Sequence, residues 1–469
     1  MEKARASAGA KRAEQIADLI EQEIVDERVP AGTNLGGEAE LMAQLGVSRA
    51  VLREALVLVS SSGLACVRRN RGLVVEAPQR ENAAAALLAY LERTIEDTDE
   101  IWLLRICVEV LAVTLAAERA DATDIAEIEA LTVSLEQASG PAAIKDLTSA
   151  TTHRVFLAAH NTWVSVLSEA LSHLTFVHTL RNTAEGAQPL SYTQLAALRR
   201  EQARACISAD LATAIATTHR VYRLFRSGRD LRDPELAHPK GPLSLSGPIG
   251  GARWKLGQLL AEKLRREIAQ KGYGEGSSLG AEMELMKAHA VGRATLREAV
   301  RLLERMGRVK MVRGRGGGLI VTEPDPQRIS RNILIHLRRL SVGRQETIEF
   351  STALFLSIVD AICRLPEARK ANLLELRATM TRVNPQTEAL TAIGVMQLLC
   401  KSTGLRGFSL MAYLSEALLE SDSNVANDVE LGSERTTIDR LFDRLIQADA
   451  VGARIAVLRL NRAAFATPG

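Results

Sequence analysis

Four arginines recur at intervals of four residues in the second half of the chain: Arg293, Arg297, Arg301 and Arg305. In a helix, this spacing gathers the guanidinium groups into one slowly drifting stripe. Apolar residues at spacings of three and four occupy the opposite side, namely Leu296, Ala299, Leu303 and Met306. Such a stripe could donate forked hydrogen bonds to guanine edges in a major groove and reach the phosphates beside it.

The segment after these arginines reads as a hairpin with a basic tip. Gly307 ends the helix, and the patterns Val309–Val312 and Leu319–Val321 predict two short strands around a turn at residues 316–318. Arg313 and Arg315 lie next to that turn. A basic helix followed by a basic hairpin suits a major groove and its adjacent backbone. The alternative is a solvated charged helix beside an ordinary hairpin.

An earlier stretch repeats this pattern, which favours the first interpretation. Residues 35–56 align with residues 279–300 without a gap, and 13 of the 22 positions are identical. Arg49 and Arg53 coincide with Arg293 and Arg297. The chain therefore contains an internal repeat with a spacing of about 244 residues, which decides its domain organisation. The second hairpin turn is two glycines longer than the first.

The first copy predicts three helices and a hairpin. Isoleucines at positions 16, 20 and 24 predict an amphipathic helix over residues 13–29, and Glu38–Leu45 predicts a short second helix. Ser48 can cap a third helix that runs to Ser62. Strands at residues 64–68 and 73–75, joined by a tight turn at residues 70–72, complete the unit.

The composition restricts the function to a few classes. The 59 basic and 56 acidic residues nearly cancel, so any affinity for nucleic acid must come from local patches. Aromatic residues make up only 3%, which argues against a platform that stacks single-stranded bases. Five scattered cysteines without a C-x-x-C pair indicate neither disulfides nor a zinc ribbon, and no apolar run reaches 18 residues. We expect a cytoplasmic protein without a membrane span.

These patterns predict a mainly α protein with five segments. Residues 1–80 and 254–326 form two winged helix-turn-helix domains, here called the first and second heads. Residues 81–227 and 327–469 form two all-helical bundles, the first and second helical blocks. Residues 228–253 are rich in proline and glycine and read as a linker.

The heads resemble the GntR family of bacterial transcription regulators. The motifs that carry the resemblance are Glu38-Ala-Glu-Leu41, Gly46-Val-Ser-Arg49 and Leu52-Arg-Glu-Ala55, with their counterparts after Glu282. The helical blocks look like the FCD ligand domain of the family's fatty-acid-regulator subgroup, through Arg105 to Glu109 and through His153 with Asn161. The resemblance covers nearly the whole chain, but twice, where the family normally has one copy.

The resemblance implies DNA contacts from the third helix of each head and from each hairpin, or wing: Arg49, Arg53, Arg69, Arg71, Gly72, Arg293, Arg297, Arg301, Arg313, Arg315 and Gly316. For the helix arginines, the alternative is an ion pair within the helix, for instance with Glu54 or Glu298. Arg301 can contact a phosphate or only solvate its helix, and the sequence leaves both open.

The resemblance also implies an effector pocket in the first block, with the candidate residues Arg105, His153, Arg199 and His219. Arg105 could bind a carboxylate-like metabolite, or it could pair with Glu109 one turn later. Many such domains hold a divalent metal through one aspartate and three histidines. Here Ser149 and Arg199 replace two of those ligands, and the second block shows none of the histidines. We therefore expect no metal and no other cofactor.

Together these observations predict a regulator, most simply a repressor, that binds a double-stranded operator through two non-identical heads. The two halves would pair within one chain as a pseudo-dimer on an asymmetric site, be released by a small metabolite, and leave room for further self-association. The alternatives are an architectural or interaction protein with one inactive head, and an enzyme. The enzyme is disfavoured because the sequence shows no G-x-S-x-G, P-loop or H-E-x-x-H motif.

Overall fold

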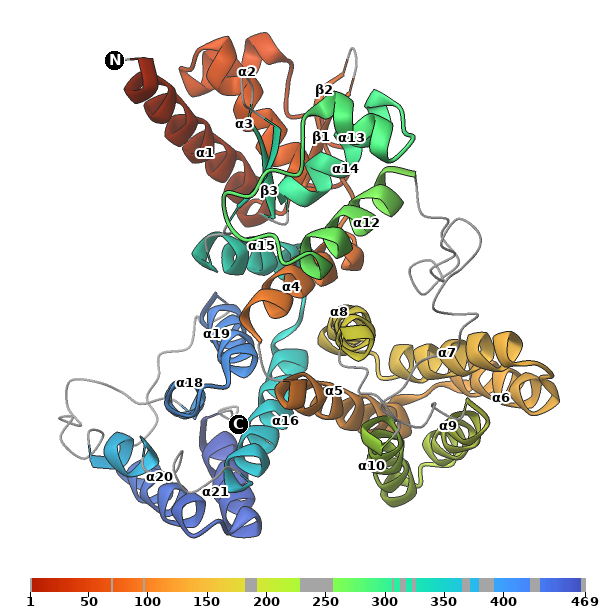
Figure 1. Cartoon of the computed structure of the whole chain (residues 1–469). Coiled ribbons are helices and arrows are strands. Elements are labelled where there is room, and N and C mark those ends of the chain that lie inside the picture. The colour runs from red at the N-terminus through yellow and green to blue at the C-terminus, as the bar shows by residue number, and fades with distance from the viewer. Residues whose placement is uncertain are drawn as a thin grey trace. The chain divides into compact units, whose positions relative to one another are not determined.

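The computed structural model describes residues 2–68, 71–95, 98–181, 192–227, 256–305, 308–312, 318–322, 326–364, 372–378, 392–421 and 431–464. The chain forms two compact units (Figure 1). Unit 1 comprises residues 1–90 and 241–341 and contains both heads. Unit 2 comprises residues 91–240 and 342–469 and contains both helical blocks. The units therefore combine segments from the two halves of the chain.

The first head contains α1 (Glu2–Asp26), α2 (Glu38–Leu45) and α3 (Arg49–Ser62), followed by the strands β1 (Ala65–Arg68) and β2 (Gly72–Val75). The second and third helices therefore lie where the sequence predicts them. The Ser48 side chain accepts a hydrogen bond from the Val51 amide and so caps α3. Gly63 ends α3 in the left-handed conformation, with φ of 76°. The first helix extends further towards the N-terminus than the expected residues 13–29.

The core of the first head is built by the apolar faces of its helices and wing. Ile16, Ile20 and Ile24 of α1 are buried against Leu52 of α3 and Leu73 of β2. The predicted isoleucine periodicity therefore identifies the face of α1 that packs inwards. The antiparallel wing pairs Ala65 with Val75 and Arg68 with Gly72, and three residues separate its strands.

The second head repeats this arrangement. Its elements are α12 (Leu256–Gln270), α13 (Glu282–Ala288), α14 (Arg293–Arg305), β3 (Val309–Val312) and β4 (Gly318–Val321). Leu264, Leu296, Leu303 and Leu319 are central to its own core. The wing pairs Val312 with Gly318, so five residues separate its strands and the expected difference in wing length is confirmed.

A helix that follows the second head packs against the first head. This helix, α15 (Pro326–Arg339), contacts α1, and Ile335 joins the core of the first head. The Arg331 guanidinium lies 2.6 Å from a carboxylate oxygen of Asp18. Arg339 donates hydrogen bonds to the carbonyl oxygens of Val29 and Glu76, at 2.6 and 3.1 Å. Residues from the two halves of the chain thus build unit 1 together.

The helix α4 (Arg80–Thr94) connects the first head to the first helical block, whose other helices are α5 (Thr98–Arg119), α6 (Ala122–Gln137), α7 (Pro141–Leu157), α8 (Thr162–Arg181), α9 (Tyr192–Ile207) and α10 (Leu211–Ser227). The second block contains α16 (Arg344–Cys363), α18 (Ala392–Thr403), α19 (Arg406–Ser421), α20 (Leu431–Ile446) and α21 (Ala450–Ala464). The protein is therefore mainly α, as expected. None of the described helices is both long enough and apolar enough to cross a bilayer.

The two blocks meet through their longest corresponding helices, α5 and α16. Each of these helices also contacts one helix of the other block: α5 contacts α19, and α16 contacts α8. The Trp163 ring of α8 stacks on Phe350 of α16, with ring centroids 4.5 Å apart. Arg119 of α5 pairs with Glu349 of α16, and the amide of Asn161 lies 3.2 Å from the same carboxylate. Unit 2 therefore has a joint core.

Candidate nucleic-acid interface

The first two predicted DNA-reading residues lie at the exposed start of α3. Arg49 is the first residue of that helix, and Arg53 follows one turn later. Their side chains are 65% and 64% exposed. Arg293 and Arg297 occupy the same positions on α14, and each is 58% exposed. Both heads thus present two arginines on one face of the third helix, as the sequence predicts.

A glutamate from the preceding helix holds each pair of arginines. In the first head, Oε1 of Glu38 lies 2.6 Å from Nε of Arg53 and 3.6 Å from Nε of Arg49. In the second head, Oε1 of Glu282 lies 3.1 Å from Nε of Arg297 and 3.3 Å from Nε of Arg293. The arginines do form ion pairs, but with α2 and α13, whereas the sequence suggested Glu54 and Glu298 on the same helix.

In the first head, these ion pairs shift the pKa values of the glutamate and of one arginine. The hydrogen bond from Arg53, aided by its charge and that of Arg49, lowers the pKa of the Glu38 carboxyl below its usual value. The same hydrogen bond raises the pKa of Arg53. From the sequence, Glu38 and Glu282 had no predicted role beyond the family motif, although the two repeats share a glutamate at this aligned position. A glutamate shared by both repeats, together with two shared arginines, was the signal from which this ion pair could have been predicted.

In the described part of the first wing, one predicted contact residue is exposed and another serves the packing of the wing. Arg71 is exposed beside the turn, where it can reach a phosphate. Gly72 has a positive φ of 79°, and a Cβ there would collide with the carbonyl oxygen of Gly36. Gly72 therefore serves the packing of the wing against the preceding loop, whereas the resemblance placed it among DNA contacts. Arg69 lies outside the described residues.

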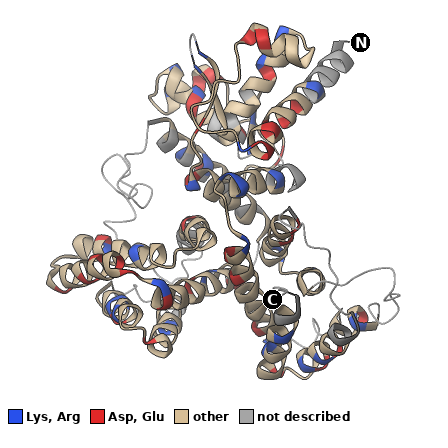
Figure 2. Ribbon diagram, turned by 180° about the vertical axis from the view of Figure 1, so that it is seen from behind, with Lys and Arg blue, Asp and Glu red and all other residues tan. Residues whose placement is uncertain are grey.

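In the second wing, Arg313, Arg315 and Gly316 all lie outside the described residues. Arg301 belongs to α14, but its side chain is likewise outside the described part of the structure. Basic and acidic residues are interspersed over the described parts of both units (Figure 2). Any nucleic-acid surface is therefore local, as the small net charge requires.

The third helices of the two heads lie side by side within unit 1, because α3 and α14 contact each other directly. The four helix arginines therefore belong to neighbouring helices of one compact unit. The contact between these helices could not be predicted from the sequence, because more than 200 residues separate α3 from α14.

The predicted effector residue Arg199 lies in a closed polar cluster. Its guanidinium is 3% exposed and pairs with the Glu109 carboxylate, which is 1% exposed. Tyr222 donates a hydrogen bond of 2.7 Å to Glu109, and the Gln202 amide bonds to Glu109 and Thr218 at 3.0 and 2.6 Å. Burial opposes the charge on Glu109, but the charge of Arg199 outweighs it, so the pKa of that carboxyl is lowered. Arg199 is therefore a structural cation, not an accessible effector ligand.

Of the other effector candidates, Arg105 lies near this cluster, where its charge helps to lower the pKa of Glu109. Arg105 is half-buried on α5, with its guanidinium 5.9 Å from the centroid of the Phe225 ring. Glu109, the expected alternative partner of Arg105, forms its ion pair with Arg199 and also lies within the field of Arg105. His219 lies on α10, where the partial loss of solvent around its ring, together with the charge of Arg364, lowers its pKa. His153 is half-buried on α7.

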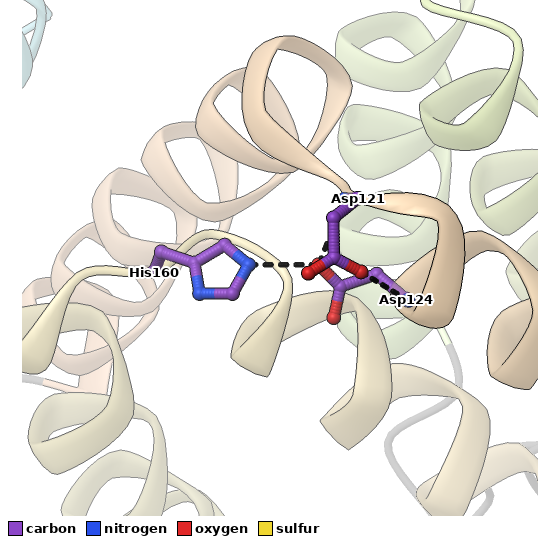
Figure 3. Close-up of side chains that lie close together, drawn as sticks. All are labelled: Asp121, Asp124 and His160. Atoms are coloured by element: carbon purple, nitrogen blue, oxygen red, sulfur yellow. Dashed lines mark hydrogen bonds and ion pairs between the residues drawn. The ribbon is translucent and has the colours of Figure 1, made fainter.

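These positions do not fit the metal site that the resemblance implies. Arg199 places a cation where a histidine ligand would stand, and His219 lies in the field of a second arginine. A different group, Asp121, Asp124 and His160, brings three potential ligand atoms together (Figure 3). These atoms already have partners. Both carboxylates cap α6, because Asp121 accepts from two backbone amides and Asp124 accepts from the Asp121 amide.

Arg154 completes this capping cluster. Its guanidinium lies 2.6 Å from Oδ1 of Asp124, while Nε2 of His160 lies 2.7 Å from Oδ2. A divalent cation at Asp124 would have to displace these bonds beside a permanent positive charge. The cluster reads as a helix cap held by two neighbouring segments.

Comparison with known proteins finds similarity in the two heads. The family model described as "Bacterial regulatory proteins, gntR family" matches the chain twice, at residues 12–75 and 256–318. These ranges coincide with the two heads. The HTH-type transcriptional repressor NanR of Citrobacter rodentium is 43% identical over 63 residues, which is 13% of this chain and 24% of that protein. NanR of Escherichia coli O1:K1 is 41% identical over the same shares.

The chain thus spans about a quarter of the length of these curated relatives. Among solved structures, Streptococcus agalactiae GntR is 20% identical with a TM-score of 0.33, covering 46% of this chain and 98% of that one. A GntR family regulator from Pseudomonas syringae pv. tomato is 22% identical with a TM-score of 0.20, covering 48% and 92%.

Proposed function

We propose that this chain, which belongs to the gntR family of bacterial regulatory proteins and carries the family's DNA-binding domain twice, is a sequence-specific transcription regulator with two non-identical heads. The observation that carries the proposal is the duplicated pair of exposed arginines at the start of α3 and of α14. Arginine forked onto guanine is the commonest specific contact in the major groove, and the start of a recognition helix commonly supplies it.

The pairing of the two halves within one chain is the second part of the proposal. The two blocks meet as in a two-fold dimer interface. The helices α5 and α16 contact each other, and α8 contacts α16 as α19 contacts α5. The interface is not the same on its two sides. Arg119 pairs with Glu349 on one side, whereas on the other Gly407 lies so close to Leu104 that a Cβ would crowd that side chain. Such differences favour pairing between unlike blocks over pairing between two first blocks.

Two unlike heads should read two unlike half-sites. Ser48, which caps α3, aligns with Gly292, and the wings differ in length by two residues. The contact between α3 and α14 favours a compact operator in which the two half-sites adjoin. We therefore propose that one chain binds one asymmetric site. Sizing experiments would also detect any further association of chains through unit 2.

Repression is the regulatory sign we propose, by analogy with the name of the NanR relatives. We further propose that a small carboxylate-like metabolite releases the DNA. Arg105, half-buried beside the Phe225 ring, is its candidate contact in the first block, as the family resemblance implies. No catalytic step is part of the proposal.

The proposal is tested by selecting binding sites from a random duplex library with the purified full-length chain. We expect enrichment of a single asymmetric sequence, bound by one chain in sizing experiments on and off DNA. Replacement of either Arg293 or Arg297 by alanine should weaken binding to the selected duplex by about ten- to a hundredfold, with a smaller loss on a shuffled duplex.

The matched Arg49 and Arg53 variant should lose protection of the other half of the footprint. Equal binding to selected and shuffled duplexes would contradict sequence-specific regulation and favour an architectural protein. Two chains on a perfect palindrome, each using the same head, would contradict the pseudo-dimer.

A further inference from the structure

We propose that Glu38 and Glu282 are specificity-determining residues that tune the arginines of their heads towards base edges and away from phosphates. This inference rests on the proposed DNA-binding function and adds a role for two acidic residues within a basic surface. Neither residue would contact the DNA bases itself. Each would act through the two arginines that it holds, as a positioning residue.

The same geometry occurs independently in both heads. One carboxylate oxygen, Oε1 of Glu38, faces the Nε atoms of Arg49 and Arg53. In the second head, Oε1 of Glu282 faces the Nε atoms of Arg293 and Arg297, both within 3.3 Å. The duplicate heads differ at nine of the 22 aligned positions around these residues but preserve this trio of side chains.

The hydrogen bond uses one edge of the Arg53 and Arg297 guanidinium groups. Arg49 and Arg293 lie within ion-pair distance of the same carboxylates. Arginine has five N–H donors, of which one is on Nε and four are on the two Nη atoms. A carboxylate at Nε fixes the plane of the guanidinium while the Nη donors can still meet O6 and N7 of a guanine. In the first head, Nη2 of Arg53 also reaches Oε2 of Glu38, at 3.3 Å. Arginines held in this way lose less conformational freedom when they bind.

The negative charge of the glutamate also acts differently on the two kinds of DNA contact. A phosphate carries a full negative charge, whereas guanine O6 and N7 are neutral acceptors with partial charges. A carboxylate beside the arginines therefore repels an approaching phosphate more than it disfavours a guanine edge. Selection against the wrong contact is a general route to specificity.

A purely structural role is a weaker explanation for these glutamates. The capping box of α2 is already formed by Glu40, whose carboxylate accepts a hydrogen bond of 2.9 Å from the Gly37 amide. Glu284 does the same for α13, with a hydrogen bond of 2.8 Å from the Ala281 amide. Ion pairs between exposed side chains contribute little to folding. The fold of each head therefore does not depend on Glu38 or Glu282.

The experiment compares full-length Glu38→Gln, Glu282→Gln and double variants with the wild type. Glu54→Gln and Glu298→Gln remove the same charge from exposed positions on the recognition helices, and none of the described contacts joins Glu54 or Glu298 to these arginines. The probes are the duplex selected by the wild type and a shuffled duplex of the same composition. Dissociation constants are measured on both at several salt concentrations, and thermal unfolding verifies that every variant is folded.

We expect the double glutamine variant to bind the shuffled duplex about three- to tenfold more tightly, with a smaller gain or a loss on the selected duplex, as expected when freed arginines reach phosphates. The salt dependence on the shuffled duplex should become steeper, by up to about 0.9 in logarithmic slope for each phosphate newly contacted. The control variants should change binding to both duplexes by the same factor.

Equal gains on both duplexes in the Glu38 and Glu282 variants, like those of the controls, would overturn the proposal and leave only a general charge effect. Unchanged binding to both duplexes would overturn it as well. In either case a discriminating wild type would leave the proposed function standing. A wild type that binds both duplexes equally would contradict the proposed function, and the role of these glutamates with it.

Discussion

The carboxylate of Glu100 lies 2.7 Å from the backbone nitrogen of Gly407, although 307 residues separate them in the chain. Glu100 is in the first turn of α5, and Gly407 is in the first turn of α19. The mirror relationship also exists, because Glu346 in the first turn of α16 accepts a hydrogen bond of 3.0 Å from the Thr162 amide at the start of α8. Each block therefore caps a helix of the other.

Replacing Glu100 by glutamine should destabilise unit 2 by about 1–3 kcal/mol, because a buried charged acceptor is lost from two backbone amides. Glu346→Gln should cost less, since this side chain is only half-buried. Urea or thermal unfolding measures both effects. The exposed Glu129 of α6 supplies a control, for which we expect a change within about 0.5 kcal/mol. A Glu100 variant as stable as this control would show that the reciprocal caps do not hold the blocks together.

The elements of the heads could be predicted from the sequence because their signals are local. The bounds Glu38–Leu45, the Ser48 cap and the isoleucine face of α1 each depend on residues within one or two turns. The joint core of unit 2 could not be predicted in this way. Glu100 and Glu346 look like ordinary acidic residues in a first helical turn, and nothing local indicates which distant amide they meet.

In the candidate site, too, the features with local signals could be predicted and the distant contacts could not. The exposed arginines were found from their spacing, but the carboxylates that hold them belong to another helix, so the sequence suggested Glu54 and Glu298 instead. Arg199 was assigned to an effector pocket because position along a helix does not reveal its partner. Only the packing of α5 against α9 brings Glu109 to it and closes the site.

Replacing Gly72 by alanine should destabilise the first head, because both the positive φ and the collision with Gly36 act against a side chain. We expect a loss of about 2–4 kcal/mol in a thermal unfolding measurement. Gly46→Ala is the matched control. Its φ is also positive, at 61°, but a Cβ there meets nothing within 4 Å, so about 1 kcal/mol is expected. If Gly72→Ala weakens DNA binding while the head stays fully stable, Gly72 is a contact residue after all.

Replacing Arg199 by methionine should destabilise the first block by about 3–5 kcal/mol at neutral pH, because it leaves the Glu109 carboxylate buried without its counter-charge. Adding Glu109→Gln should recover part of the loss by removing that charge. Chemical unfolding of the wild type and of the two variants tests this order. Equal stability of the single and double variants would show that the ion pair is not the source of the effect.

The pH dependence gives a second test of the same pair. In the wild type, the folded-state pKa of Glu109 lies below the usual value of 4.5. Its contribution is therefore present above that value and is lost as pH falls through the lower folded pKa. In Arg199→Met, burial without the counter-charge should raise the folded pKa, so that variant is penalised as pH rises. The stability gap between wild type and variant should accordingly shrink on acidification towards pH 4, and a gap that widens would contradict this reasoning.

The cluster of Asp121, Asp124 and His160 should behave as a helix cap and not as a metal site. Asp121 Oδ1 accepts hydrogen bonds of 2.8 Å from two backbone amides, and Asp124 is engaged by an amide, by His160 and by Arg154. A divalent ion needs several open, convergent ligands, and the positive charge of Arg154 opposes its binding.

Protein purified without added metal should therefore contain no stoichiometric zinc, manganese or nickel by elemental analysis, and added zinc should not raise the melting temperature. Replacing Asp124 by asparagine should lower that temperature in metal-free buffer, because the variant weakens the cap and the Arg154 ion pair. About one metal ion per chain, lost in this variant, would instead make the cluster a metal site.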